Sequence, residues 1–328
     1  MRGRLARAVG GILLGALLTY VLLRSTGDAG EAVSRIVSRV ARTSPRYLMI
    51  GFCLFVASQI MRSFRWKVLA FRRDVRMSAS IPITAAHIGL SHILPVRLSE
   101  VALLGMFRYY GDLPVGDGMA MVILSKLTDL LAMGVVIGGA VAAGLSGTPV
   151  LAASILVVAG FAGILMLPWL LEVSYRPLAS IFLRMRLGRG GVRWLRDLRC
   201  AASIKGQGKR MASAMALSVL AWGLKLWMFS FLLMAVGVRG VPLWKVFFAS
   251  GFMDLTLVLP VHGLLSLGTA EAGWAAGFAI VGITGIVEEG FSVHLLWLSM
   301  AIFLMLLALP FLASIRGLKA PLTDGGEA

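Results

Sequence analysis

The chain has 328 residues, of which 59% are hydrophobic and only 14% are charged. Soluble globular proteins carry about 25% charged residues, so this composition excludes an ordinary water-soluble enzyme. The formal net charge of +17 lies mainly between apolar runs, where it serves membrane orientation and contact with anionic lipid headgroups. It does not indicate nucleic-acid binding.

Long apolar runs predict membrane-spanning helices, because each approaches or exceeds the roughly 20 residues that cross a hydrocarbon core. The first run comes after Arg2, Arg4 and Arg7, and a basic start before an apolar stretch resembles a signal peptide. No small-x-small cleavage site follows this run, so we expect that the helix is retained. We therefore predict an all-α polytopic integral membrane protein with about eight to ten membrane segments in a single membrane domain, residues 1–328. The runs are 9–23, 47–61, 115–145, 150–171, 211–236 and 291–312.

The distribution of Lys and Arg predicts the orientation. Residues 62–76, the long basic loop 172–211 and the C-terminal end are rich in bases, so the positive-inside rule places all three in the cytoplasm. With two spans before residue 62, both termini then lie on the cytoplasmic side of a bacterial plasma membrane. Residues 24–46 lie outside; their valines at helical spacing opposite arginines predict an amphipathic helix on the bilayer surface.

Two regions do not have the pattern of simple spans. Residues 80–110 are interrupted at Pro95, and residues 243–283 are interrupted at Pro260, each within a Leu-Pro-Val sequence. Proline ends or kinks a helix, and the pieces beside each break are short, so we predict two re-entrant helical hairpins. The first enters from the cytoplasm and the second from outside, which indicates an inverted repeat of the kind found in transporters.

Ionisable side chains gather around these breaks. At membrane depth such groups cost at least about 2.5–3.5 kcal/mol each, so they normally face a cavity or a partner. We therefore treat them as the candidate binding site. The set is His87, His92, Arg97, Glu100, Arg108, Lys126, Asp129, Lys225, Asp254, His262 and Glu271.

In the first half, two pairs have helical spacing. Lys126 and Asp129 are three residues apart, as are Arg97 and Glu100, so each pair can interact directly on one helix face. One interpretation is that these pairs only fix helix packing. The other is an anion site, because a half-helix starting near Val96 directs free N–H groups at the site and arginine suits phosphate.

In the second half, His262, Gly263 and Gly268 predict a flexible turn before a helix that starts near Glu271. Glu271 is then either a favourable partner of the helix dipole or a binding residue. Asp254 lies in an apolar run, as does Lys225, and we hypothesise that the two neutralise each other across helices.

Metal, cofactor and enzyme signatures are not found. The histidines lack metal-ligand spacing, although one of them suits a proton relay. Cys53 and Cys200 predict neither a metal site nor a disulfide. No phosphate-binding loop, dinucleotide fingerprint or nucleophile elbow occurs, so we expect no cofactor and no enzymatic activity.

At these residues the sequence resembles the lysylphosphatidylglycerol synthase transmembrane, or flippase-like, family. The resemblance rests on ILPVRLSE at 93–100 with Arg108 after it, on KLTD at 126–129, and on the proline, glycines and glutamate of the second break (Pro260, Gly263, Gly268 and Glu271). It covers roughly residues 47–316. Ser99 replaces the family's usual glycine, and the segment around Lys126 lacks its commoner Glu-Arg pair.

The resemblance implies handling or movement of lipids across the bilayer. The family's soluble aminoacyl-transferase domain is not found in these residues, so we do not expect lysyl-lipid synthesis. We hypothesise a lipid flippase whose substrate has an anionic or phosphate-bearing headgroup held by Arg97 and Arg108. Glu100, Lys126 and Asp129 form the rearranging network, and the second hairpin contributes its own charges.

Other functions stay open from the sequence. The chain could be a non-transporting subunit that anchors or regulates a lipid-modifying enzyme such as a glycosyltransferase. It could also be an intramembrane lipid-modifying enzyme that uses Glu100 or His92. The glycine-rich segment 134–144 permits close helix packing within one chain or in a homodimer.

Overall fold

The computed structural model describes residue 13 and residues 16–70, 73–94, 98–144, 208–257 and 264–319. Every regular element in these ranges is helical, which confirms the all-α prediction. Within them, four helices are long and apolar enough to cross a membrane. They are α3 (Pro45–Leu69), α6 (Val115–Gly144), α9 (Gly208–Ala235) and α12 (Val287–Lys319). The predicted span 150–171 and the basic loop 172–211, apart from the first turn of α9, lie outside the described residues.

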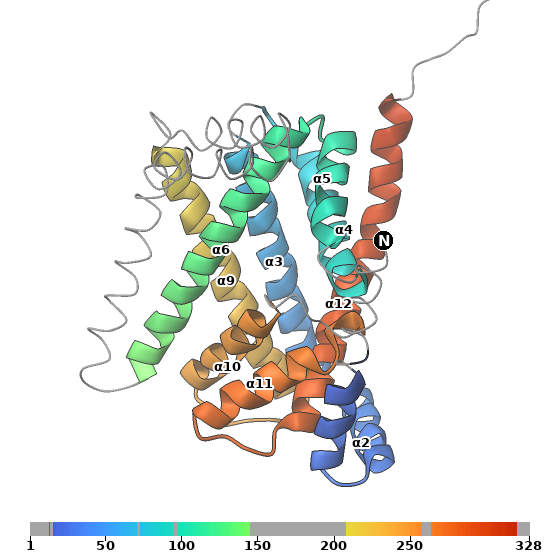
Figure 1. Cartoon of the computed structure of the whole chain (residues 1–328), viewed down its shortest axis with the longest axis vertical. Helices are drawn as coiled ribbons and strands as arrows, with labels where there is room; N and C mark the ends of the chain where they lie inside the picture. Colours follow the sequence, from blue (N-terminus) through green and yellow to red (C-terminus); the bar gives the residue numbers. More distant parts are fainter. Residues whose placement is uncertain are drawn as a thin grey trace, which may run out of the picture.

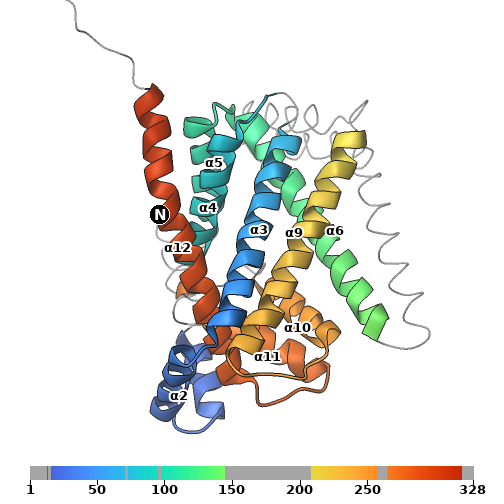
Figure 2. The ribbon, with the colours of Figure 1, turned by 180° about the vertical axis from the view of Figure 1, so that it is seen from behind.

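Helices α3 and α9 form the centre of the bundle. They lie side by side and run in opposite directions (Figures 1 and 2). The Ser58 hydroxyl on α3 donates a hydrogen bond to the carbonyl of Ala221 on α9, at 2.9 Å. Closer to the start of α3, a Cβ added at Gly51 would lie 3.1 Å from a methyl group of Leu232 on α9, so the two helices approach closely there.

Two helical hairpins occupy opposite ends of the bundle. Helices α4 (Met77–Ile93) and α5 (Leu98–Tyr110) lie at the end where α3 stops, and α10 (Leu243–Thr256) and α11 (Thr269–Ile280) lie at the end where α9 stops (Figure 1). Helix α4 ends two residues before Pro95, and α10 ends four residues before Pro260. A span, a hairpin and a second span follow one another twice along the chain, first as α3 to α6 and then as α9 to α12. The two sets run in opposite directions, which is the inverted arrangement that the two breaks predict.

Each hairpin also packs against the opposite half. Helix α4 lies along α12, and α10 lies against α6. A Cβ added at Gly89 on α4 would come within 2.5 Å of the Met305 Cβ on α12. The hairpins meet each other as well, because the short 3₁₀ turn η1 (Leu264–Ser266), which precedes α11, contacts α4.

The two helices of the second hairpin, α10 and α11, pack closely at a glycine. A Cβ added at Gly277 on α11 would lie 2.8 Å from the Cα of Ala249 on α10, so only a hydrogen fits between the backbones. The indole N–H of Trp274 donates to the Ser250 hydroxyl at 3.0 Å. Small residues at such contacts are the usual way in which membrane helices pack closely.

The segment before α3 contains two further helices. An apolar helix spans Ala16–Ser25, which overlaps the predicted first run 9–23 and extends two residues beyond it. Helix α2 (Ala29–Ala41) begins after Asp28, whose carboxylate accepts hydrogen bonds from the backbone N–H groups of Gly30 and Glu31. A helix is thus present where the amphipathic one was predicted, with Ile36 buried and Val37 exposed on its apolar side. Its position on the bilayer surface stays a prediction.

Candidate functional site

The ionisable residues lie where the inner ends of the hairpins meet the four spans. Glu100 is the third residue of α5, Glu271 the third residue of α11, and Asp254 stands two residues before the end of α10. Each carboxylate faces a basic residue of a span. The pairs are Glu100 with Lys126 of α6, Asp254 with Lys225 of α9, and Glu271 with His294 of α12; on α6 itself, Asp129 faces Arg65 of α3.

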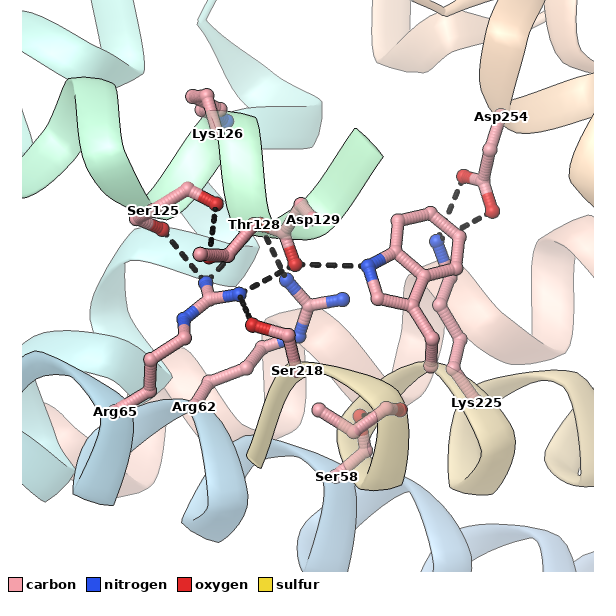
Figure 3. A network of polar contacts seen from close by, with 12 residues as sticks. Ser58, Arg62, Arg65, Ser125, Lys126, Thr128, Asp129, Ser218, Lys225 and Asp254 are labelled. Atoms are coloured by element: carbon pink, nitrogen blue, oxygen red, sulfur yellow. Dashed lines mark hydrogen bonds and ion pairs between the residues drawn. The ribbon is translucent and has the colours of Figure 1, made fainter. Parts of the chain in front are cut away.

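A largely buried pair joins α3 to α6. The guanidinium of Arg65 donates to both carboxylate oxygens of Asp129, at 2.5 and 3.0 Å, and its side chain is only 1% exposed (Figure 3). It also donates to the hydroxyls of Ser125 on α6 and Ser218 on α9, at 2.7 and 2.9 Å. This bidentate geometry satisfies a charge that burial would otherwise destabilise.

A second guanidinium shares the same carboxylate. Arg62 lies 3.5 Å from Asp129 (Figure 3). Its guanidinium also lies over the Trp222 ring, 5.6 Å from the ring centroid. The Trp222 indole N–H donates to Asp129 at 2.7 Å. Two arginines therefore face one carboxylate, and the buried Nε of Arg62 has no hydrogen-bond partner in the described part of the chain. This centre carries an excess positive charge with unused donor capacity.

The position of Arg62 and Arg65 corrects the sequence analysis. The positive-inside rule assigned residues 62–76 to a cytoplasmic loop, but α3 continues to Leu69, so both arginines lie inside a span. Their cost is reduced because they meet a carboxylate, an indole ring and two hydroxyls there.

The pairing of Lys225 with Asp254 is confirmed. The ammonium lies 2.7 and 2.9 Å from the two carboxylate oxygens (Figure 3). It also lies 4.9 Å from the ring centroids of both Trp222 and Trp297. The aromatic faces add cation–π stabilisation to the ion pair. This contact ties α9 to the inner end of the second hairpin.

The predicted pairing of Lys126 with Asp129 is wrong. Lys126 instead lies 2.5 Å from Glu100 on α5, while Asp129 turns toward α3. His87 on α4 lies 3.7 Å from the same glutamate. The Lys126 side chain is 56% exposed, so this is the most open ion pair of the network. It ties α6 to the inner end of the first hairpin.

Glu271 acts at the start of α11. One carboxylate oxygen accepts a hydrogen bond from the backbone N–H of Gly268 at 2.7 Å, which is the helix-start role that the sequence suggested. Gly268 has a φ of 80°, a conformation that favours glycine. The other oxygen lies 2.5 Å from Nδ1 of His294 on α12. The sequence analysis missed His294, which stands alone among apolar residues.

A second histidine lies beside this pair. The His92 ring on α4 is 6.1 Å from the His294 ring and 4.4 Å from the Trp297 ring. Both ring nitrogens of His92 are buried without a hydrogen-bond partner among the described residues. A buried polar group without a partner costs about 1–3 kcal/mol, so structural packing alone does not account for His92.

Some predicted site residues do not join the network. Arg108 is exposed near the far end of α5. Eight residues separate it from Glu100, roughly 12 Å along a helix. Arg97 and His262 lie outside the described residues, together with three predicted helix-break residues. These are Pro95, Pro260 and Gly263.

The described residues offer no group of three or more His, Cys, Asp or Glu side chains that could hold a metal ion. The contacts found in the network are ion pairs and hydrogen bonds. Its donors are guanidinium, ammonium, indole and hydroxyl groups, which suit an anionic ligand.

Comparison with known proteins decides the family. A family model described as the lysylphosphatidylglycerol synthase TM region matches residues 8–308. The chain belongs to this family. The match includes three of the four spans, both hairpins and most of α12, and it links this membrane protein to lipid handling. The matched family is the transmembrane region, and the match gives no evidence for or against catalysis in this chain. Comparisons with curated proteins and with solved structures gave no match.

Proposed function

We propose that the protein moves an amphipathic lipid with an anionic or phosphate-bearing headgroup across a bacterial plasma membrane. The observation that carries this proposal is the position of Arg62. It lies within a span, shares Asp129 with Arg65, and keeps a buried Nε–H without a partner in the described residues. A lipid phosphate supplies the missing negative charge and accepts that hydrogen bond.

The inverted arrangement supports a transport role. The hairpins occupy opposite ends of the bundle, and a span holds the inner end of each through an ion pair. The Glu100–Lys126 pair holds the first hairpin, and the Asp254–Lys225 pair holds the second. A headgroup that competes for Lys126 or Lys225 weakens the contact between that hairpin and its span. Alternating weakening of the two contacts would open the site first to one side and then to the other.

The orientation follows from the charges. Arg73 and Arg76 precede the first hairpin, and Lys209 and Arg210 lie in the first turn of α9 at the same end of the bundle. We place this end in the cytoplasm by the positive-inside rule, together with both chain termini. The first hairpin then faces the cytoplasm, and α2 and the second hairpin face the outside.

Proteoliposomes provide the test. The full chain is reconstituted with a fluorescent phosphatidic acid, and movement of the headgroup between leaflets is followed by chemical quenching. The variant Arg62→Gln should slow movement by about tenfold or more, because it removes a charge-assisted contact with the phosphate. It should fold normally, since Arg65 still neutralises Asp129.

The matched control is Arg46→Gln, which removes an exposed arginine from the first turn of the same helix. It should change the rate by about twofold or less. A wild-type rate in Arg62→Gln would overturn the assignment of the headgroup to Arg62. If the wild-type protein moves no lipid but co-purifies with a lipid-modifying enzyme, the anchoring function replaces transport.

A further inference from the structure

A basic pocket lies at the end of the bundle that carries α2, away from the intramembrane network. Its volume is about 570 Å³. Its walls are one face of α2, the turn between α2 and α3, and the last residues of α9 with the segment that follows. The lining residues are Ser34, Arg35, Ser38, Arg39, Arg42, Ser44, Met234, Ala235, Val236, Gly237 and Arg239. Four of them are arginines, and none is acidic.

Helix α2 presents two faces. Its apolar side contains Ile36, which is buried, and Val33 and Val37, which are 47% and 59% exposed. The serines and arginines of the pocket lie at helical spacing on the opposite side. This arrangement leaves the exposed valines to contact lipid while the polar face closes the pocket.

Two of the four arginines hold α2 in place. Arg35 lies 2.9 Å from Glu288, and Arg39 lies 2.9 Å from Glu289; both glutamates are in the first turn of α12. Arg35 also pairs with Glu31 within α2. These acids neutralise the wall of the pocket that is formed by Arg35 and Arg39.

The other two arginines are not neutralised. Arg42 directly follows the last residue of α2, and Arg239 lies in the segment after α9; both are exposed. Across the residues that the structure describes, neither makes an ion pair or a side-chain hydrogen bond. Arg42 also lies where α2 presents its negative dipole end, which is sufficient reason for a base there. Arg239 follows the C-terminal end of α9, which likewise favours a base nearby.

The end of α9 at the floor of the pocket opposes an anion less than a helix end with free carbonyls would. Free carbonyls at a helix C-terminus would repel negative charge. Here the carbonyl of Ala235 accepts from the N–H of Ser44 at 3.0 Å. The carbonyls of Met234 and Leu233 accept from the N–H groups of Gly237 and Val238, at 3.2 and 3.0 Å. The last carbonyls are therefore already engaged.

We propose that this pocket binds a phosphate or diphosphate group, with Arg42 and Arg239 as its principal ligands. Guanidinium groups match phosphate oxygens in geometry and charge, and the hydroxyls of Ser34 and Ser38 add donors at the wall. The group belongs either to a lipid at the membrane surface or to a soluble phosphate. The site stands whether or not the protein transports lipid, because it shares no residue with the network.

The test measures binding to the full chain in detergent, with two probes: a fluorescent phosphatidic acid and inorganic pyrophosphate. The pocket variant is Arg42→Gln/Arg239→Gln. The matched control is Arg24→Gln/Arg46→Gln, which removes the same charge from exposed arginines of the same region outside the pocket lining. Both are also made in an Arg62→Gln background, which separates pocket binding from binding at the network.

Pyrophosphate should displace phosphatidic acid from the wild-type pocket. The pocket variant should weaken binding by about tenfold or more, and the control by about twofold or less. Equal weakening by both variants, or wild-type binding by the pocket variant, would overturn the proposal. Tighter binding of phosphatidic acid than of pyrophosphate identifies the lipid as the source of the phosphate, whereas equal or weaker binding identifies a soluble phosphate.

Discussion

The ammonium of Lys225 on α9 lies 2.7 Å from the carboxylate of Asp254 at the inner end of α10. Their side chains are 11% and 9% exposed, and two indole rings cover the ammonium. This pair connects a membrane span to a hairpin across helices that are distant in sequence. The other hairpin is tied in the same way by Lys126 and Glu100.

Breaking the Lys225–Asp254 pair should destabilise the protein. Each single variant, Lys225→Met or Asp254→Asn, leaves a buried charge without its partner, at a cost of about 3–5 kcal/mol. The double variant should recover at least half of that loss, because no charge is left alone. Thermal unfolding in detergent, followed by tryptophan fluorescence, measures both effects.

The exposed pair Lys67–Asp74 provides the control. Their side chains are 43% and 78% exposed, at a separation of 3.4 Å. Lys67→Met should cost about 1 kcal/mol or less. If Lys225→Met costs no more than Lys67→Met, the buried pair does not hold the hairpin.

Charge reversal should test the contact between the first hairpin and α6. Glu100→Lys places two ammonium groups together, and Lys126→Glu places two carboxylates together. Each single reversal should lower both thermal stability and lipid movement. The double reversal should restore most of the lost stability, because an opposite-charge pair forms again. Lys209→Glu, in the exposed first turn of α9, controls for charge reversal itself. Additive losses in the double variant would show that the two residues do not interact.

Glycine-to-alanine substitutions at two positions should have different effects on the thermal midpoint of unfolding. Alanine normally stabilises a helix relative to glycine by about 1 kcal/mol. Gly139→Ala on α6 adds its methyl group where no atom lies within 4 Å, so the thermal midpoint should stay or rise. Gly277→Ala on α11 places a methyl group 2.8 Å from the Cα of Ala249, so the midpoint should fall. A rise in both variants would contradict the close packing of α10 and α11.

The sequence predicted those features of the fold that depend on local chemistry. The lengths of the apolar runs predicted the membrane spans, and the two prolines predicted the helix breaks. Neither signal depends on which helices become neighbours in the fold. The positive-inside rule failed at Arg62 and Arg65. The rule counts bases near the ends of spans, and it has no means of showing that both arginines within α3 contact a carboxylate on α6.

Charge pairing was predictable only in part. Helical spacing identifies neighbours on one helix, so it favoured Lys126 with Asp129, whereas both residues pair with other helices. The Lys225–Asp254 pair was anticipated because two lone charges in apolar runs need partners. His294 was missed for a related reason: its partner, Glu271, lies 23 residues away in sequence, and no motif marks it.

The measurement that tests the central claim most directly compares two lipids in the same proteoliposomes. Phosphatidic acid and phosphatidylcholine with identical acyl chains differ in headgroup charge, and each is followed from one leaflet to the other. The wild-type protein should move phosphatidic acid about tenfold faster or more, because only the anion compensates the excess charge at Arg62. The preference should disappear in Arg62→Gln. Equal rates for both lipids in the wild-type protein, or rates no faster than in protein-free vesicles, would contradict transport of an anionic headgroup through this site.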